Sequence, residues 1–550
     1  MRKKIVALFM ATLMATTLFA GCGKGAADEV LSEEVSQDTA VAESSVEDTQ
    51  TEEANVSDEE TSTLISETPV ELTIFRTVNN LVFDGEAPVW QEVGKRTNVY
   101  LKGVVSENNS SESDAYNLMV ASGELADLIC YKNMSEMEKL GMDSGLIPLN
   151  DLIKEYAPNI QNLLDSDIKF KNAATAYNGN IYQVPYSADG FFQECWWIRQ
   201  DWLDKLNLEV PTTVDELYDV LTAFKTQDPN GNGLQDEVPL FDRAGHKMPE
   251  EYLYLWDTST GFYPRDGVMT FEPLTENFKI GVENMAKWYQ EGLIDQEIFT
   301  RGSKARDTLF GENLSGVTHD WNSVSDYNAK LADTIPGFKM VAFAPPANQD
   351  GVVRERTSAS PTVGTGISVN CKDPVTAIKF IDYLCTQEGA KLTQCGFEDD
   401  TYVITDGEIS YTDKAVKSEL GLVGYLRSIG AQFALAGKKA QGAEKSAYTN
   451  PEVIAAYELY SSNPQWYETN LPPYSDGELD LKYSDEVSAE YQLLMSSIKP
   501  YVEETFQSWI LGTAKFDDSS YEEFVKELKA RGIDRAIEIN QEAYDMYLNN

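Results

Sequence analysis

The sequence predicts an α/β protein built on a mainly parallel sheet. From residue 71 onward, short runs rich in β-branched and aromatic residues alternate with amphipathic stretches of helical period. Such alternation is typical of strands joined by crossover helices. The chain has 550 residues, of which 42% are hydrophobic. It can therefore fill large cores and is expected to form more than one domain.

The first elements of the folded body follow that order. They are a strand at 71–75, the end of a helix at 90–97, a strand at 98–105, a helix at 113–122 and a strand at 125–131. Ligands of parallel sheets bind beyond the carboxyl ends of the strands. Arg76, Asp127 and Tyr131 are expected near such ends, and Asp127 and Tyr131 are therefore candidate ligand-binding residues.

The charge of the chain excludes several classes of partner. Its 44 Lys and Arg face 90 Asp and Glu, which gives a net charge of −46. Binding of nucleic acids depends on basic residues that displace counterions, so no nucleic-acid partner is expected. Two histidines, His246 and His319, leave little room for a His-rich zinc site or a His-based catalytic triad.

Residues 1–22 are predicted to be a lipoprotein signal peptide. Arg2, Lys3 and Lys4 precede an apolar run that is too short for a comfortable transmembrane helix. The sequence LFAGC, ending at Cys22, resembles a bacterial lipobox, in which the Cys thiol is diacylated. An ordinary signal peptide with an incidental Cys is the alternative. The expected location is the extracellular face of a cell membrane, lipid-anchored, in a Gram-positive type of bacterium.

Residues 23–70 are predicted to be an acidic disordered tether. Between 25 and 70 there are fourteen Asp or Glu and no Lys or Arg. Such a segment cannot bury enough surface to offset its ordering entropy, and its like charges keep it extended.

The order of motifs in the folded body resembles the bacterial extracellular solute-binding proteins of family 1, in particular LplA-like lipoproteins and alginate-binding proteins. The resemblance covers nearly all of residues 71–550. It is carried by TNVYLKGVV, YNLMVASGELADLI, YNGNIYQVPY, the long stretch from WWIRQDWLDKL to NGNGLQDEVPL, ENMAKWYQEGLIDQEIFT, and the C-terminal stretch from YSDEVSAEY to AYDMYL.

The resemblance implies a periplasmic-binding-protein-like two-lobe (type II) fold with a ligand cleft between the lobes. The chain is expected to cross between lobes near 184–186, 343–346 and 399–404. The expected domains are lobe 1 at 71–185 plus 347–400, and lobe 2 at 186–346 plus 401–550.

A calcium loop is the sharpest chemical motif of the sequence. Oxygen-bearing side chains recur from residue 228, a glycine at 233 allows a sharp turn, and residue 234 offers its carbonyl. Pro239 stands where an EF-hand has its last Glu, so Glu237 is expected to substitute. The resemblance implies calcium at this shortened pattern. The predicted ligands of a structural Ca2+ are Asp228, Asn230, Asn232, Leu234, Asp236 and Glu237.

The alternative for this loop is a plain Asp/Asn/Gly turn. It follows a helix expected at 214–224, which Thr213 and Glu216 begin as a capping box.

The ligand site is expected to combine aromatic faces, which cover a sugar ring, with polar groups that bind hydroxyls. Trp321, after a short strand-like run, is the first stacking candidate, with Asp320 and Asn322 beside it. The other candidates are Trp256, Trp466, Arg199, Tyr186, Asp127 and Tyr131. Arg199 either bridges ligand hydroxyls or pairs with Asp201. Trp202, Trp288 and Trp509 lie on helical stripes and are expected in the core.

The resemblance implies a non-catalytic, monomeric receptor that captures an oligosaccharide and delivers it to the membrane permeases of an ABC importer. A surface glycosidase with paired carboxylates is one alternative, although no P-loop, HExxH or GxSxG motif is present. A peptide receptor of the same fold is the other. The five cysteines after Cys22 cannot all pair with one another. Cys385 with Cys371 or Cys395 is a possible disulfide, and buried free thiols are the alternative.

Overall fold

The computed structural model describes residues 64–549 apart from 79–80, 107–110, 188–193, 244–248, 356–362, 406, 447, 449, 468–473, 476–477 and 480. These residues all belong to one folded unit, Ser62–Asn550. The predicted signal peptide, Cys22 and nearly all of the predicted tether lie outside the described residues. Within them, no helix is both long enough and apolar enough to span a membrane.

The first sheet has six strands in the order β16-β6-β13-β5-β1-β4. The strands are β1 (Val70–Phe75), β4 (Val99–Gly103), β5 (Leu128–Tyr131), β6 (Val184–Ser187), β13 (Val363–Ile367) and β16 (Gly437–Lys438). The pairs β1–β4 and β1–β5 are parallel, which confirms the three strands predicted near the start of the body. The pair β16–β6 is parallel as well, and β13 alone is antiparallel to its neighbours, β5 and β6, so the sheet is mainly parallel with one reversed strand.

Both faces of the first sheet are buried. In β5, Leu128 and Cys130 join one core cluster while Ile129 and Tyr131 join another, as alternation along a strand requires. The helices that accompany this sheet in sequence are α1 (Pro88–Thr97), α2 (Glu112–Ser122), α3 (Met134–Met142), α4 (Asn150–Tyr156), α5 (Pro158–Ser166), α6 (Ile168–Ala174), α12 (Pro374–Leu384), α13 (Gln387–Cys395), α14 (Asp413–Val416), α15 (Gly421–Ser428) and α16 (Ala443–Ser446).

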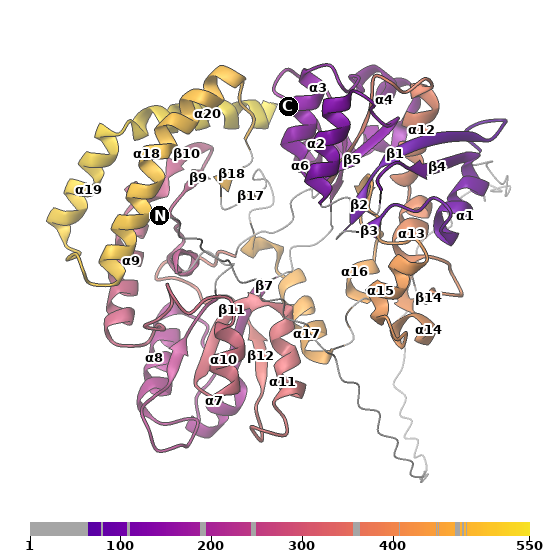
Figure 1. Cartoon of the computed structure of the whole chain (residues 1–550). Helices are drawn as coiled ribbons and strands as arrows, with labels where there is room; N and C mark the ends of the chain where they lie inside the picture. The colour runs from indigo at the N-terminus through magenta and orange to yellow at the C-terminus, as the bar shows by residue number, and fades with distance from the viewer. Residues whose placement is uncertain are drawn as a thin grey trace, which may run out of the picture. The chain divides into compact units, whose positions relative to one another are not determined.

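The second sheet has four strands in the order β12-β7-β11-β8, and β7, β11 and β12 lie side by side in Figure 1. The strands are β7 (Glu194–Arg199), β8 (Val238–Leu240), β11 (Ser315–Trp321) and β12 (Met340–Phe343). Here too the strand faces alternate, because Trp196 and Ile198 of β7 enter one core and Cys195 and Trp197 enter another.

A helical layer completes the second core. The long C-terminal helices follow one another in yellow in Figure 1, and α18 packs against α9. The elements are α7 (Gln200–Leu206), α8 (Val214–Thr226), α9 (Glu276–Gln290), α10 (Ala305–Gly311), α11 (Asp326–Lys330), α17 (Pro451–Ser461), α18 (Asp485–Ile510), α19 (Asp518–Ala530), α20 (Ile533–Asn549) and the 3-10 helices η1 (Glu250–Trp256), η2 (Glu272–Leu274), η3 (Asn322–Ser325) and η4 (Pro464–Trp466). Trp202, Trp288 and Trp509 are buried here, which confirms their assignment to the core.

Four short hairpins lie outside the two sheets. They are β2–β3 (Thr77–Val78, Leu81–Val82), β9–β10 (Phe262–Arg265, Val268–Phe271), β14–β15 (Tyr402–Thr405, Glu408–Tyr411) and β17–β18 (Tyr474–Ser475, Glu478–Leu479). All five cysteines of the described body are free, so neither of the possible disulfides is formed in this structure.

The chain passes from the first sheet to the second between β6 and β7, and returns between β12 and β13, close to two of the predicted crossings. Beyond the third predicted crossing, near 399–404, the chain stays beside the first sheet. Residues 437–438 still pair with β6, and Leu426 and Phe433 still pack in the first core. The chain lies against the second sheet again at α17. There Val453 and Tyr460 are buried in the cluster that also holds Cys195 and Trp197 of β7.

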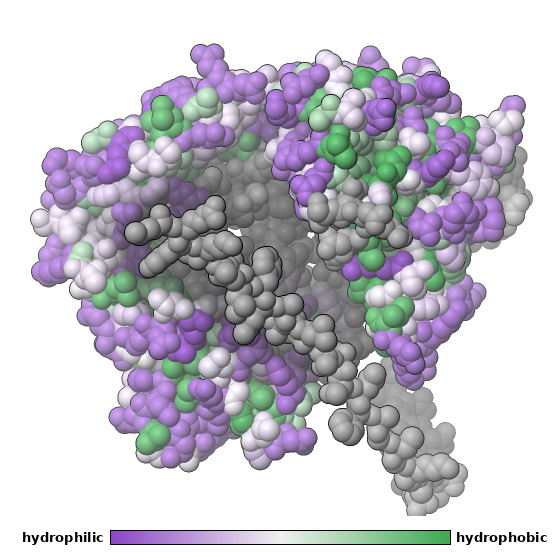
Figure 2. Space-filling view, in the orientation of Figure 1, coloured by the Kyte–Doolittle hydropathy of each residue, from purple (hydrophilic) through white to green (hydrophobic). Residues whose placement is uncertain are grey.

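The visible face in Figure 2 is mostly hydrophilic, with hydrophobic residues scattered in small groups. This agrees with the strong excess of acidic residues in the sequence.

Candidate functional site

The loop predicted to hold calcium joins α8 to β8. The helix begins at Thr213 and Glu216, which form the predicted capping box. After the helix the backbone turns sharply, with φ of +48° at Asp228, +76° at Gly231 and +81° at Gly233. Glycine adopts this left-handed region at little cost. The two glycines therefore allow the compact turns that bring the side chains of the loop together.

Oxygen-bearing side chains of the loop point inward and organise its backbone. The Asp228 carboxylate accepts hydrogen bonds from the backbone N–H groups of Gly231 at 2.8 Å and Gly233 at 3.0 Å. The Asn232 amide donates to both carboxylate oxygens of Asp236 at 3.1 Å, and the Asn230 amide lies 3.4 Å from the same carboxylate. Four of the six predicted ligands are thus adjacent.

Glu237 closes the loop with a buried carboxylate. The residue is 0% exposed, and neither carboxylate oxygen has a hydrogen-bond partner among the described residues. Burial, together with the charges of Asp236 and Asp228, raises the pKa of Glu237. An unpartnered buried carboxylate beside two others is costly without a cation. The donor set is therefore suited to a hard cation with oxygen ligands.

The sixth predicted ligand, Leu234, has a side chain that is 61% exposed. Its backbone N–H donates to the Asn232 side chain at 2.7 Å, so the residue follows the turn. Only the backbone carbonyl of Leu234 is predicted to bind Ca2+, so the exposure of its side chain does not affect that prediction.

Trp321 is the last residue of β11 and is 41% exposed. Among the described residues no other tryptophan or phenylalanine is as exposed. Asn322, which follows it, begins η3, and its carbonyl accepts a hydrogen bond from Ser325 at 2.9 Å.

Asp320, the residue before this tryptophan, has a carboxylate that binds other side chains of the protein. It is 0% exposed and accepts two hydrogen bonds from the Arg243 guanidinium at 2.8 and 2.7 Å. Arg306 lies 3.2 Å from the same carboxylate. Asp320 was predicted to bind a ligand. In this structure its carboxylate instead contacts Arg243 and Arg306. The sequence analysis predicted neither arginine as a partner of Asp320, because no local pattern links them to it.

Trp256 and Arg199, also predicted to contact ligand, are core residues in this structure. Trp256 is 2% exposed, and its ring centroid lies 5.2 Å from that of Trp288. Arg199 is 1% exposed and donates to Asp201 at 2.8 and 2.6 Å. Of the two readings of Arg199, the structure therefore shows the pairing with Asp201.

The candidates in the first sheet do not come together at one strand end. Asp127 precedes β5 and accepts hydrogen bonds from the N–H and hydroxyl of Thr73 at 2.8 and 2.6 Å. Tyr131 ends β5, is 2% exposed and stacks on Tyr116 with centroids 4.0 Å apart. At about 3.3 Å per residue the two lie at opposite ends of the strand.

The last two candidates are half-buried. Tyr186 of β6 donates its hydroxyl hydrogen to Gln394 at 3.4 Å. Trp466 of η4 packs against Tyr460 at 5.3 Å, and its backbone carbonyl accepts the N–H of Glu355 at 2.8 Å.

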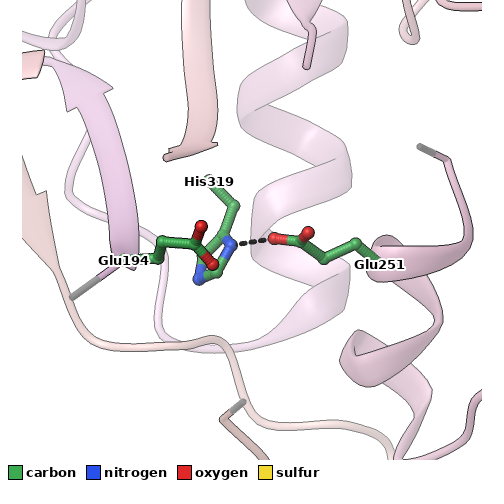
Figure 3. Close-up of side chains that lie close together, drawn as sticks. All are labelled: Glu194, Glu251 and His319. Atoms are coloured by element: carbon green, nitrogen blue, oxygen red, sulfur yellow. Dashed lines mark hydrogen bonds and ion pairs between the residues drawn. The ribbon is translucent and has the colours of Figure 1, made fainter. Parts of the chain in front are cut away.

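A buried cluster around His319 is a feature that the sequence analysis did not find. One nitrogen of His319 and one oxygen each of Glu194 and Glu251 lie within 4.8 Å of one another. Figure 3 shows the imidazole between the two carboxylates. The Nδ1 atom is hydrogen-bonded to Glu251, and Nε2 lies 3.2 Å from Glu355 Oε1. Burial lowers the pKa of His319, but Glu355 and Glu251 raise it, and the net pKa is well above its usual value.

The comparisons with known proteins agree with this architecture. Residues 86–391, more than half of the chain, match the family of bacterial extracellular solute-binding proteins. The chain belongs to this family. The resemblance noted in the sequence is thereby confirmed. Because the family consists of binding proteins, membership also confirms the expectation that the chain is not an enzyme.

Several relatives in the solute-binding family have been studied. The structure of the alginate-binding protein AlgQ2 without calcium ion is 34% identical, with a TM-score of 0.63 over 88% of this chain and 99% of AlgQ2. This likeness confirms the expected periplasmic-binding-protein-like α/β fold. A structure of a FusA EF-hand mutant shares the fold, with a TM-score of 0.60 over 88% of this chain and 100% of FusA at 21% identity.

Two curated relatives match part of the sequence. The fructooligosaccharide ABC transporter substrate-binding protein FusA of Streptococcus pneumoniae is 32% identical over 291 residues, 49% of this chain and 52% of FusA. The lipoprotein LipO of Bacillus subtilis is 26% identical over 333 residues, 57% of this chain and 63% of LipO. In these alignments the chain spans about half of FusA and less than two thirds of LipO.

Proposed function

We propose that the chain is the substrate-binding lipoprotein of an ABC importer and that it captures an oligosaccharide for delivery to membrane permeases. Membership in the solute-binding family supports this role, and FusA and AlgQ2 are relatives whose names refer to fructooligosaccharide and alginate. The protein acts as a monomer in this proposal.

The exposed indole of Trp321 is the observation that carries the sugar proposal. Its face is available to solvent at the end of a buried strand, and an aromatic face is the group that covers the apolar side of a sugar ring. Arg306 is less than one-fifth exposed and contacts the carboxylate of Asp320, the residue before this tryptophan. An arginine therefore lies next to the main chain that carries the indole.

A matched pair of tryptophan variants tests this site. Trp321→Ala should weaken oligosaccharide binding by about 5- to 150-fold, the effect of losing roughly 1–3 kcal/mol of aromatic burial, with little loss of stability. Trp256→Ala should cost about 3–5 kcal/mol of stability as a core deletion, with affinity per folded molecule unchanged. Calorimetric titration with kestose and with alginate oligosaccharides, alongside denaturant melting, measures both. A large stability loss with unchanged affinity for Trp321→Ala would return Trp321 to the core.

The same titrations separate the alternatives. A receptor shifts its melting temperature on binding and leaves the oligosaccharide intact, whereas a glycosidase with paired carboxylates yields shorter products. A peptide receptor responds to a peptide panel and not to glycans. Chromatography of the recovered sugar and a glycan-versus-peptide thermal-shift panel decide among the three.

The two sheets, each with its own core, support a division of the body into two lobes. The pairing of β16 with β6 favours a first lobe that extends through residue 438 in place of 400, with the second lobe holding β7 to β12 and the chain from α17 onward. Closure of such lobes around a ligand is a hinge motion. X-ray scattering should show compaction on saturation with the oligosaccharide, and identical curves would contradict it.

The loop 228–237 holds a structural Ca2+ in this proposal. The side chains of Asp228, Asn230, Asn232, Asp236 and Glu237, with the Leu234 carbonyl, would supply the oxygen ligands. The buried carboxylate of Glu237, which has no hydrogen-bond partner among the described residues, supports a cation at this position. One AlgQ2 structure is described as lacking calcium ion, and one FusA structure as an EF-hand mutant.

Calcium-dependent melting tests this loop. Ca2+ should raise the melting temperature of the full chain, and Asp236→Ala should abolish that response. Asp204→Ala, an exposed carboxylate on α7, is the matched control and should retain it. An unchanged calcium response in Asp236→Ala would refute the site.

Anchoring through diacylated Cys22 completes the proposal. Several acyl chains hold a protein stably because each buried CH2 contributes about 0.8 kcal/mol, and LipO is a lipoprotein relative. Cys22→Ser should release the protein from cells into the medium. If the variant stays membrane-bound, the lipobox prediction is wrong.

A further inference from the structure

The register of β7 and β11 brings four side chains to one face of the second sheet. Glu194 pairs with Trp321, and Trp196 pairs with His319. Residues two apart along a strand point to the same side. The glutamate and the histidine therefore lie diagonally on one face, next to the ring of Trp196, whose centroid is 5.2 Å from the imidazole.

A second carboxylate reaches this face from outside the sheet. Glu251, in the first turn of η1, is hydrogen-bonded to Nδ1 of His319. Figure 3 shows Glu194 and Glu251 on either side of the imidazole. One ligand-capable atom from each of the three residues lies within 4.8 Å of the others. Three potential ligands thus converge from three separate elements.

The cluster is buried and rich in negative charge. His319 is 2% exposed and Glu251 is 4% exposed. Glu355 at 6% and Asp242 at 1% exposure lie in the same region, and burial, together with the charge of Glu251, raises the pKa of Asp242 well above its usual value. One imidazole therefore faces several carboxylates at low solvent exposure, where uncompensated charge is most costly.

The second imidazole nitrogen has the surroundings expected when the first nitrogen binds a metal. Nε2 of His319 lies 3.2 Å from Glu355 Oε1. A metal-ligating histidine characteristically donates its other N–H to a carboxylate, which fixes the tautomer. With a cation on Nδ1 the proton resides on Nε2, next to the Glu355 carboxylate.

We propose that His319, Glu251 and Glu194 form a site for a divalent transition metal, Zn2+, in the second core. The imidazole Nδ1 and one oxygen of each carboxylate are the ligands, and Glu355 orients the imidazole through Nε2. A nitrogen plus carboxylate oxygens is a donor set that Zn2+ accepts, with a fourth position left for water or solute. The ion would join β7, β11 and η1. The site is separate from the oxygen-only loop 228–237 and does not depend on the transport proposal.

Zinc titration of the metal-stripped full chain tests the site. The measurement is calorimetric, in excess Ca2+ so that the loop 228–237 does not compete. We expect one Zn2+ per chain, and at least about tenfold weaker binding in Glu194→Gln and His319→Gln, because even outer-shell partners contribute 10- to 100-fold. Asp204→Ala, which removes an exposed carboxylate of α7 outside both proposed metal sites, is the control and should bind Zn2+ like the wild type.

Co2+ serves as a spectroscopic probe of the same ligands. Visible absorption of bound Co2+ should appear in the wild type and in Asp204→Ala, and should be lost or shifted in both cluster variants. Circular dichroism checks folding; if His319→Gln does not fold, Glu194→Gln decides, because Glu194 is only partly buried. Absence of Zn2+ binding in the wild type, or equal affinity in the wild type and Glu194→Gln, would overturn the proposal and leave an ion-paired histidine.

Discussion

The loop 228–237 and the cluster around His319 gather carboxylates in opposite ways. The loop is a short continuous segment, largely exposed, that offers only oxygen atoms, and one of its carboxylates, Glu237, is buried. The cluster is buried, includes a nitrogen, and draws its residues from β7, η1 and β11. The loop can therefore rearrange locally around a large hard cation. The cluster can change only if the packing of the second core changes.

Asp228→Ala should give the largest effect, and only on the loop. It removes a proposed ligand and the acceptor of the Gly231 and Gly233 backbone N–H groups. At calcium concentrations about 100 times Kd, the lost stabilisation is about 2.7 kcal/mol. Denaturant melting with and without EGTA measures it. A calcium response equal to that of the wild type would show that the loop is only a turn.

Glu251→Gln should destabilise the protein by about 1–3 kcal/mol, because the buried imidazole of His319 loses its charged hydrogen-bond partner. Unlike the loss in Asp228→Ala, this loss should be the same with Ca2+ and with EGTA. The same pair of melting curves measures it. A calcium-dependent loss would mean that the two regions are coupled, and the contrast drawn above would fail.

Glu237→Gln should separate the two roles of the buried carboxylate. Without Ca2+ the variant should be more stable than the wild type by about 1 kcal/mol, because a neutral amide costs less to bury than a charge. With Ca2+ it should lose most of the calcium stabilisation. Opposite signs in the two conditions are the expected result. Destabilisation in both would show that Glu237 is held by packing alone.

Asp167 lies outside both regions and should make a smaller, acid-sensitive contribution to the stability of the protein. Its carboxylate accepts the backbone N–H groups at the start of α6 and lies 2.7 Å from Lys438 Nζ. Although burial raises the pKa of Asp167, the Lys438 and backbone hydrogen bonds lower it below its usual value. Its stabilisation is therefore present above the unfolded pKa near 3.9 and is lost as the pH falls through the lower folded pKa.

Asp167→Asn should remove that acid-dependent contribution, an effect of less than about 1 kcal/mol for a half-exposed pair. Melting between pH 2 and 5, with EGTA present throughout, measures it. Asp165→Asn, an exposed neighbour that accepts from Gln161, is the matched control. Equal acid sensitivity in both variants would contradict the role of Asp167.

The contrast between the loop and the cluster also shows which parts of the structure can be predicted from the sequence. The loop could be predicted because its ligands lie within ten residues and its glycines mark the turns. Strands β1, β4 and β5 and helices α2 and α8 were predictable for the same reason, since their patterns are local. Glu194, Glu251 and His319 are brought together only by the register of β7 and β11 and the packing of η1, which no local pattern records.

Burial separates candidate residues that the sequence treats alike. Trp256 and Trp321 both stand near turns in the sequence, yet one is 2% and the other 41% exposed. Asp320 beside Trp321 suggested a hydroxyl acceptor, but Arg243, 77 residues away, takes both of its oxygens. The first sheet is mainly parallel, as the local alternation predicted, but no local pattern records that β13 returns from the second sheet with the opposite direction.

The hydrogen bonds beneath Trp321 have a consequence for the entropy of recognition. The N–H of Trp321 donates to Asp320 Oδ1 at 2.6 Å, and that carboxylate is itself held by Arg243 and Arg306. The main chain that carries the indole is thus already ordered before any solute arrives. Ordering of side chains and loops is a main cost of association. A ring that meets this indole would therefore lose less of its binding free energy to immobilisation than one that meets an aromatic residue on an unsupported loop.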